Sequence, residues 1–386
     1  MRFLTAGESH GKYLTAIISE YPSGVQIDKD YIDEQLAKRQ AGFGRGTRMS
    51  IERDKVKIIS GVSSGVSTGA PICLFIENLD WQNSQKRIEN EKDILNPRPG
   101  HADLTGYLKY RGKSIRDVIE RSSARETAAR VAVGGFAGLL LGQFGVSTAG
   151  FTEQIGTISI DLKSSPGEEM NPAKQKKIFE AAEKSILRCP DKKAEQKMVS
   201  LIKQAAGRGD TLGGTVKIIS SGIVPGLGSY IQWDQRLDSR IAAAVMSIPS
   251  VKAVGFGAGF SSGKISGTSF HDEIFYEKSR GFYRKQNNAG GIEGGMSNGQ
   301  NIEITAAVKP IPTTNAGLKT VNIKSKETEI SLKERSDVCA VPAVSVIAAA
   351  AVNIELANAY QYKFGADNIV EMTDNFNNYK RYLDNI

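Results

Sequence analysis

The sequence predicts an α+β fold in which antiparallel sheets pack on helices. Strand-like segments occur in adjacent groups rather than in strict alternation with helices, a pattern typical of antiparallel pairing. The 386-residue chain is 40% hydrophobic and 24% charged, as globular proteins with a sizeable core are. Because no Pro/Ser-rich linker or low-complexity tract interrupts it, we expect a single domain over residues 1–386.

The first half of the chain is predicted to contain a capped helix followed by a hairpin. Residues 28–40 predict a helix with Asp28 as its N-cap. Apolar residues alternate with period two at 56–58 and again at 72–76, and a turn-rich segment lies between them. These two segments are therefore expected to pair.

The second half repeats this mixture of helices and strands. Helical periodicity or an Ala-rich composition predicts helices, and period-two alternation predicts strands. The predicted helices cover 172–187, 192–206, 237–246 and 341–364, and the predicted strands cover 215–219, 301–305 and 321–324.

The expected location is the cytoplasm. The longest nearly uninterrupted apolar stretch, 344–352, is far shorter than the roughly 20 residues that span a bilayer, so we expect no membrane span. The amino terminus has an early acid and lacks the apolar core of a secretory signal. Cys73, Cys189 and Cys339 are widely spaced and odd in number, which fits neither a disulfide framework nor a metal site, so reduced thiols are expected.

The formal net charge of +8 requires a partner or another explanation. A basic surface can bind nucleic acid or anionic membrane, or it can capture a small multiply charged substrate. A nucleic-acid binder would interleave basic residues with exposed aromatic residues. Here several arginines stand in glycine-rich turns, as in 42–48, beside the arginine-containing segments 98–101 and 121–123, which favours a pocket.

Histidines are scarce, and two of the three lie in glycine-containing loops. His10 lies in Gly-Glu-Ser-His-Gly and His101 in Pro-Gly-His-Ala-Asp, where a ligand can approach the backbone closely. From this context alone, a structural role and a proton-transfer role have about equal weight for each. His271 stands in a polar segment and is expected at the surface.

Arginines give the next signal. Arg39, Arg45 and Arg48 could clamp a substrate that carries phosphate and carboxylate, although a solvated turn with ordinary salt bridges fits them equally well. Residues 123–126 have the form of a capping box, which predicts a buried helix that begins just after Arg121. Its start would bind an anion through backbone N–H groups, or would simply be capped.

The glycine-rich runs match no nucleotide fingerprint. Residues 255–259 lack the spacing of the dinucleotide motif, and 263–265 do not fit a Walker loop. The run 287–299 is too long and glycine-dense for a tight turn, so it can wrap a flat cofactor or form a mobile lid.

Taken together, seven ordered motifs along nearly the whole chain resemble those of chorismate synthases. The resemblance implies an anti-1,4-elimination of phosphate from 5-enolpyruvylshikimate 3-phosphate, with reduced FMN required but no net redox change. It also implies two antiparallel sheets that enclose helices, a homotetramer, and the last step of the shikimate pathway to aromatic amino acids. The motifs are 7–11, 39–49, 98–103, 121–127, 290–299, 309–313 and 335–339.

The resemblance also implies roles for individual residues. His10 would lie near the departing phosphate, His101 near the flavin, and Asp337 would deprotonate the flavin. Substrate would be bound by Ser9, Arg39, Arg45 and Arg48. FMN would be bound by Arg121, Ser122, Ser123, Pro249, Ser250, Gly294, Lys309, Pro310, Ile311, Pro312, Thr313 and Arg335. The flavin would be reduced by NADPH at this site or by an external flavin reductase.

Two departures from the family pattern and three rival classes remain. Pro249-Ser250 stands where the family often has Asn-Ala, and Ala349-Ala350 where it often has an acidic residue.

An NADPH-dependent flavin oxidoreductase would not need arginines and histidines around a leaving phosphate. A nucleic-acid-binding protein would show strongly salt-dependent affinity for DNA or RNA. A purely structural subunit would bind no flavin.

Overall fold

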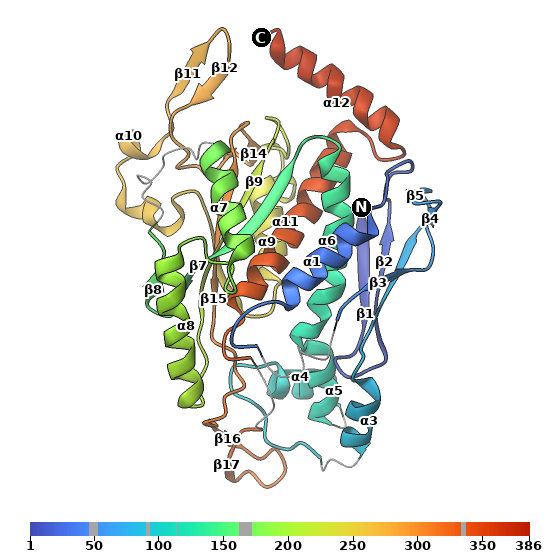
Figure 1. Cartoon of the computed structure of the whole chain (residues 1–386), viewed down its shortest axis with the longest axis vertical. Helices are drawn as coiled ribbons and strands as arrows, with labels where there is room; N and C mark the ends of the chain where they lie inside the picture. The colour runs from blue at the N-terminus through green and yellow to red at the C-terminus, as the bar shows by residue number, and fades with distance from the viewer. Residues whose placement is uncertain (46–52, 90–92, 113, 162–171, 333–336) are drawn as a thin grey trace.

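Two antiparallel sheets enclose a layer of helices (Figure 1). The computed structural model describes residues 1–45, 53–89, 93–112, 114–161, 172–332 and 337–386. One sheet has the order β1 (Arg2–Gly7), β2 (Tyr13–Ser19), β6 (Ile72–Glu77), β3 (Val56–Ile58). The other has the order β10 (Val251–Phe256), β15 (Ile302–Val308), β9 (Gly214–Ser221), β7 (Ser147–Ile155), β8 (Ile158–Ser159). The predicted α+β class and the pairing of 56–58 with 72–76 are confirmed.

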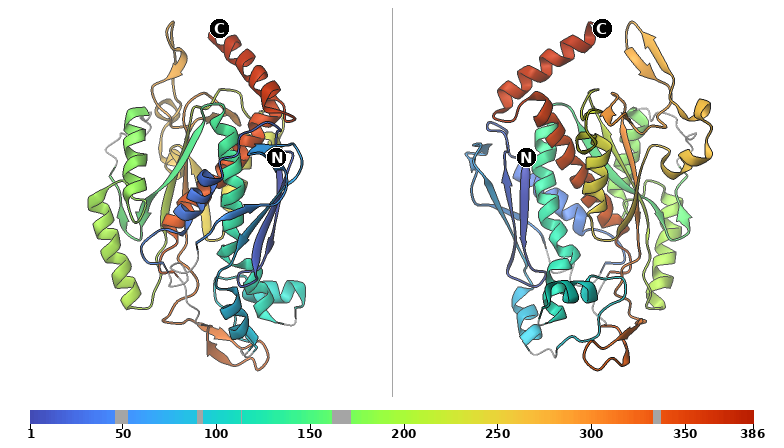
Figure 2. Two further views of the ribbon diagram at one scale, coloured as in Figure 1. Left: turned by 45° about the vertical axis from the view of Figure 1, so that its right-hand side comes forward. Right: turned by 180° about the vertical axis from the view of Figure 1, so that it is seen from behind.

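Helices fill the space between the sheets and cover one outer face (Figure 2). The inner layer contains α1 (Lys29–Gln40), α6 (Thr127–Gly142), α9 (Leu237–Met246) and α11 (Val341–Phe364). On the outside of the five-stranded sheet lie α7 (Pro172–Lys184) and α8 (Lys192–Gly207), and α12 (Ile369–Asp384) extends beyond the layers. Asp28 caps α1 by accepting a hydrogen bond from the backbone of Tyr31, as predicted.

The remaining elements are short. They are α3 (Trp81–Glu89), α4 (Asp103–Tyr110), α5 (Ile115–Ser122), α10 (Gly267–Phe270), the 3-10 turns Ala124–Glu126, Trp233–Gln235 and Gly259–Lys264, and the pairs β4 (Val62–Ser63) with β5 (Val66–Ser67), β11 (Ile274–Glu277) with β12 (Gly281–Arg284), β13 (Ile292–Glu293) with β14 (Met296–Ser297) and β16 (Lys319–Val321) with β17 (Thr328–Ile330).

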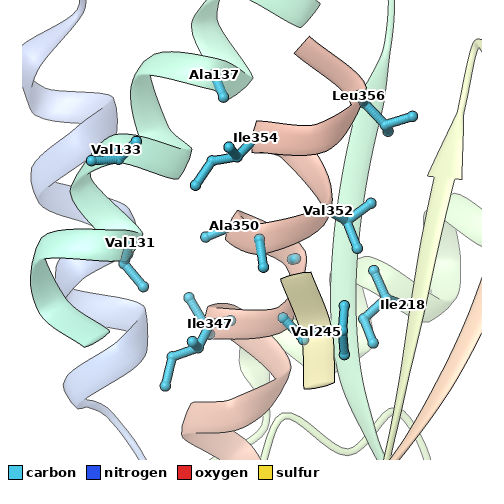
Figure 3. Packing of buried hydrophobic residues seen from close by; sticks show 14 of the residues in the cluster. Val131, Val133, Ala137, Ile218, Val245, Ile347, Ala350, Val352, Ile354 and Leu356 are labelled. Carbon is cyan, nitrogen blue, oxygen red and sulfur yellow. The ribbon is translucent and has the colours of Figure 1, made fainter. Parts of the chain in front are cut away.

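The close contact of α6 with α11 sets the geometry of the inner layer. In Figure 3, Ala350 and Ile354 of α11 point toward α6, whereas Val352 and Leu356 point toward β9 and α9. A Cβ added to Gly134 of α6 would lie 2.4 Å from the Cβ of Ala350, so only glycine permits this approach. The two helices run parallel, and their N-terminal ends therefore lie at the same end of the molecule.

Burial identifies α11 as a core helix. It is 24 residues long and apolar enough to cross a membrane by length and composition, but 89% of its most apolar window is buried inside the protein. The apolar stretch at 344–352 therefore contributes to the hydrophobic core.

Three predictions about local structure were wrong. The buried helix begins at Thr127, because the amphipathic helix α5 extends through Ser122 and the extended backbone of Ser123 separates the two. The strand expected at 321–324 ends at Val321. The run 287–299 is no long open loop: it contains the tight β13–β14 hairpin, whose turn residues Gly294 and Gly295 have φ of 56° and 83°.

Candidate active site

Three helix ends meet below the middle of the molecule in Figure 1. They are the N-terminal ends of α6 and α11 and the C-terminal end of α1. Arg39, in the last turn of α1, donates to the carbonyl of Ala124 at 3.0 Å, and Gly42 lies against Pro342 at the start of α11. Because the N-terminal end of a helix carries partial positive charge, two such ends side by side favour a bound anion.

The loop between β1 and β2 carries Ser9 and His10 onto the end of α5. Both oxygens of the Glu120 carboxylate bind His10: Oε1 lies 2.8 Å from ring Nδ1, and Oε2 accepts from the backbone N–H at 2.9 Å. Ser9 donates its backbone N–H to the Glu120 carbonyl, and its hydroxyl accepts from the hydroxyl of Ser123 at 3.1 Å. The His10 ring is thus fixed at the helix end.

His101 is held in the same manner at the start of α4. Its Nδ1 lies 2.5 Å from Oδ1 of Asp103, which is fully buried. Arg98 donates to both oxygens of that carboxylate and also to the hydroxyl of Thr313 at 3.1 Å. Since α4 and α5 form an antiparallel pair, with Gly106 against Val118, the His101 and Glu120 ends of these helices lie on the same side.

Both carboxylates are ionised despite their burial. Burial alone would raise the pKa of Asp103, but hydrogen bonds from His101 and Arg98 outweigh it and hold this pKa well below the ordinary value. Burial likewise opposes the ionisation of Glu120. The hydrogen bonds and charge of His10, and to a smaller extent the charge of Arg116, lower the pKa of Glu120. A carboxylate only accepts hydrogen bonds, so Nδ1 of each histidine carries the proton in these contacts.

A buried ionic cluster supports the same end of α1. Arg39 donates to Thr127 and lies 3.4 Å from Asp54, which also receives a 2.6 Å bond from Arg125. Burial lowers the pKa of Arg39 to about 9, and the charge of Asp54 opposes this change. Arg125 also donates to Asn78, which in turn holds the carbonyl of Gly11. Arg39 therefore links the end of α1 to the start of α6.

Arg45 and Asp337 form an ion pair of 3.1 Å at the start of α11. The backbone of Leu212 donates to the carbonyl of Val338, and the hydroxyl of Thr211 donates to the carbonyl of Ile311. Asp337 therefore borders the segment 309–313. Arg48 and Arg335, the other predicted contacts of this region, lie outside the described residues.

The segment 309–313 joins the His101 loop to the residue that precedes β10. Lys309 donates its ammonium to the carbonyl of Gly100 at 2.5 Å and its backbone N–H to the carbonyl of Ser250 at 2.8 Å. Burial, aided by the charge of Lys252, lowers the pKa of Lys309. Ser250, which follows Pro249, has a φ of 85°, a strained value for a non-glycine residue. The rest of the segment contacts the same region: the carbonyl of Ile311 accepts from Thr211 and the hydroxyl of Thr313 accepts from Arg98, with Pro310 and Pro312 between and beside them.

The helix start expected at residues 121–123 was wrong, and Gly294 lies apart from Pro249 and Ser250. Arg121 and Ser122 form the last turn of α5, so they offer no free backbone N–H groups to an anion, and the side chain of Arg121 instead donates to the carbonyl of Thr5 at 2.9 Å. Gly294 lies beside the N-terminal end of α9, where Leu237 donates to Gly295, whereas Pro249 and Ser250 follow its other end. Ten residues of helix, about 15 Å, separate them.

The supporting residues Glu120, Asp103, Asp54 and Arg125 escaped the sequence analysis. Asp103 stands two residues after His101, and this spacing could have indicated the pair. Glu120 is 110 positions from His10, and no local pattern indicates such a contact. A cavity of about 730 Å³ between α7 and the ends of β7 and β9, lined by Gln175 and Phe179, lies outside this cluster.

The fold and the cluster define an α+β protein with a site of arginine–carboxylate pairs and two carboxylate-bound histidines. A family model described as chorismate synthase matches residues 1–361. The chorismate synthase of Endomicrobium trichonymphae is 49% identical over 389 residues, and that of Geobacter sulfurreducens is 47% identical over 397 residues, each alignment covering 99% of both chains. A crystal structure of a chorismate synthase matches with a TM-score of 0.83 and 37% identity, covering 100% of this chain and 98% of that one. The chain belongs to the chorismate synthase family and is a lyase of the shikimate pathway.

Proposed function

We propose that this enzyme catalyses the anti-1,4-elimination of phosphate from 5-enolpyruvylshikimate 3-phosphate to give chorismate, with reduced FMN bound at the site described above. The observations that carry the proposal are the two histidine–carboxylate pairs and the hydrogen bonds that tie their loops to neighbouring predicted site residues, Ser9 to Ser123 and Arg98 to Thr313. A substrate with one phosphate and two carboxylates needs such a site, and a leaving phosphate is stabilised by fixed positive charge.

The residues present fit an anionic flavin. Burial, and then the charge of Lys252, lower the pKa of Lys309, so a bound anion would stabilise the Lys309 ammonium and relieve the repulsion between the two charges. Ser250 and the neighbouring segment 309–313 would contact FMN through backbone groups, and such contacts would survive the change from the Asn-Ala often found in the family to Pro249-Ser250. Arg121, Ser123 and Arg335 would complete these contacts. When bound, reduced FMN would supply electron density to the carbon–oxygen bond that breaks.

The protein's own groups would bind, orient and move protons. Arg39, Arg45 and Arg48 would hold the substrate's anionic groups, and Ser9 would bind beside His10. His10 would deliver a proton to the departing phosphate, while His101 and Asp337 would manage protons on the flavin side. We place this single-domain enzyme in the cytoplasm as a homotetramer. Gly294 is the predicted cofactor contact that a single subunit explains least, because it lies at the opposite end of α9 from Ser250.

The test is an anaerobic assay of phosphate and chorismate release with photoreduced FMN. Equal amounts of both products, and none when flavin or reduction is omitted, are expected. Replacing light with NADPH distinguishes an enzyme that reduces its own flavin from one that needs an external reductase. Tight binding of reduced FMN without product release would refute the elimination, and no flavin binding would refute the cofactor as well.

A further inference from the structure

We infer that Glu120 is a positioning residue that fixes the orientation of His10, so that proton exchange with the ligand takes place at the Nε2 atom of the ring. This inference rests on the proposed function, in which His10 acts on the departing phosphate. It starts from one carboxylate that binds two different nitrogens of the same residue.

The geometry leaves the ring little freedom. The backbone N–H and the ring Nδ1 of His10 are bound by the two oxygens of Glu120 at 2.9 and 2.8 Å. The side chains of both residues are mostly buried, with exposed fractions of 13% and 10%. Gln85 of α3 additionally donates to the His10 carbonyl at 3.1 Å. Rotation of the ring would break a charge-assisted hydrogen bond in a partly desolvated site.

The contact also determines which ring nitrogen of His10 keeps its proton. Glu120 is ionised and can only accept, so Nδ1 keeps its proton and Nε2 is the atom that can give one up. When Nε2–H transfers its proton to a phosphate oxygen, the Nε2–H bond breaks, an O–H bond forms, and the ring becomes neutral imidazole that still donates Nδ1–H to Glu120. No rearrangement of the pair is needed during the transfer.

The charge of Glu120 is directed mainly at His10. Its neighbouring cation on α5, Arg116, lies at 3.6 Å, whereas His10 lies at 2.8 Å. At the other histidine the balance differs, because Arg98 binds both oxygens of Asp103 at 2.8 and 3.1 Å and matches its charge. Glu120 therefore directs more of its charge at its histidine than Asp103 does.

The test compares Glu120→Gln with Glu303→Gln. Glu303 on β15 is a matched control, because its side chain is 12% exposed and is paired with Lys217 at 2.9 Å, on a strand far in sequence from both histidine loops. Glu120→Gln keeps an acceptor for Nδ1–H but loses the charge. We expect kcat to fall roughly 10- to 100-fold, with KM and FMN affinity within about twofold of the parent. The alkaline limb of the kcat profile should move to lower pH, and Glu303→Gln should change none of these quantities.

A second readout needs no turnover. Diethyl pyrocarbonate modifies neutral imidazole, and peptide mass spectrometry resolves His10 from the other two histidines. We expect His10 of Glu120→Gln to react faster at neutral pH than His10 of the parent. An unchanged pH profile together with an unchanged modification rate would overturn the inference and leave Glu120 a structural residue. A parent enzyme without turnover, in which the modification rates still differ, would contradict the proposed function and leave the positioning role standing.

Discussion

Replacement of Asp54 by asparagine tests the buried ionic cluster beneath the site. The Asp54 carboxylate has a fully buried side chain and lies 2.6 Å from Arg125 and 3.4 Å from Arg39, which are 4% and 5% exposed. At an effective dielectric constant of about 20, these distances correspond to attractions of about 6 and 5 kcal/mol, most of which offsets the desolvation of the three ions. Removal of one partner from such a cluster costs about 3–5 kcal/mol, and we expect Asp54→Asn to lower the free energy of unfolding by that amount.

The assay is urea denaturation at fixed protein concentration, because assembly makes stability concentration-dependent. Glu77→Gln serves as the control, since Glu77 pairs with the exposed Lys57 and its loss should leave the unfolding midpoint nearly unchanged. If Asp54→Asn unfolds at the same urea concentration as the parent, the two guanidinium groups do not depend on this carboxylate, and the reasoning fails.

Three further outcomes are expected. Gly134→Ala should destabilise the protein by about 1–3 kcal/mol or more in thermal unfolding, because the new methyl group meets α11. Gly142→Ala, with open space around it, should be neutral or stabilising, and equal effects of the two substitutions would contradict the packing. Ionised Asp103 should contribute stability that is complete above the ordinary carboxyl pKa of about 4 and is lost as pH falls below it. In urea titrations from pH 7 to 3, the free energy of unfolding should therefore fall less steeply with acid in Asp103→Asn than in the parent, and parallel curves would refute this. Burial raises the pKa of Cys189 to about 11 and of Cys339 to about 12, so both should resist alkylation at neutral pH until the protein unfolds, and rapid native labelling of either would contradict their burial.

Local signals were sufficient for much of the fold. Asp28 predicted the start of α1, and the apolar composition of 341–364 predicted α11 with its bounds, because caps and periodicity act within a few residues. The start of α6 was misplaced because Ser123 both ends α5 and caps the 3-10 turn that follows, and a capping motif does not distinguish these roles.

The candidate site depended more on tertiary structure. Glycine context indicated His10 and His101, but Glu120, the carboxylate partner of His10, is 110 positions away and is brought there by the packing of the β1–β2 loop on α5. The arginines were recognised as a group, yet the sequence could not show that Arg39 is buried against α6, since that requires the antiparallel approach of α1.

The most direct test is a crystal structure of the enzyme soaked with oxidised FMN and the phosphorylated substrate. We predict both ligands at the shared end of α6 and α11, with phosphate beside His10 and the flavin against the 309–313 segment. Ligands bound elsewhere, for example in the cavity lined by Gln175 and Phe179, would contradict it.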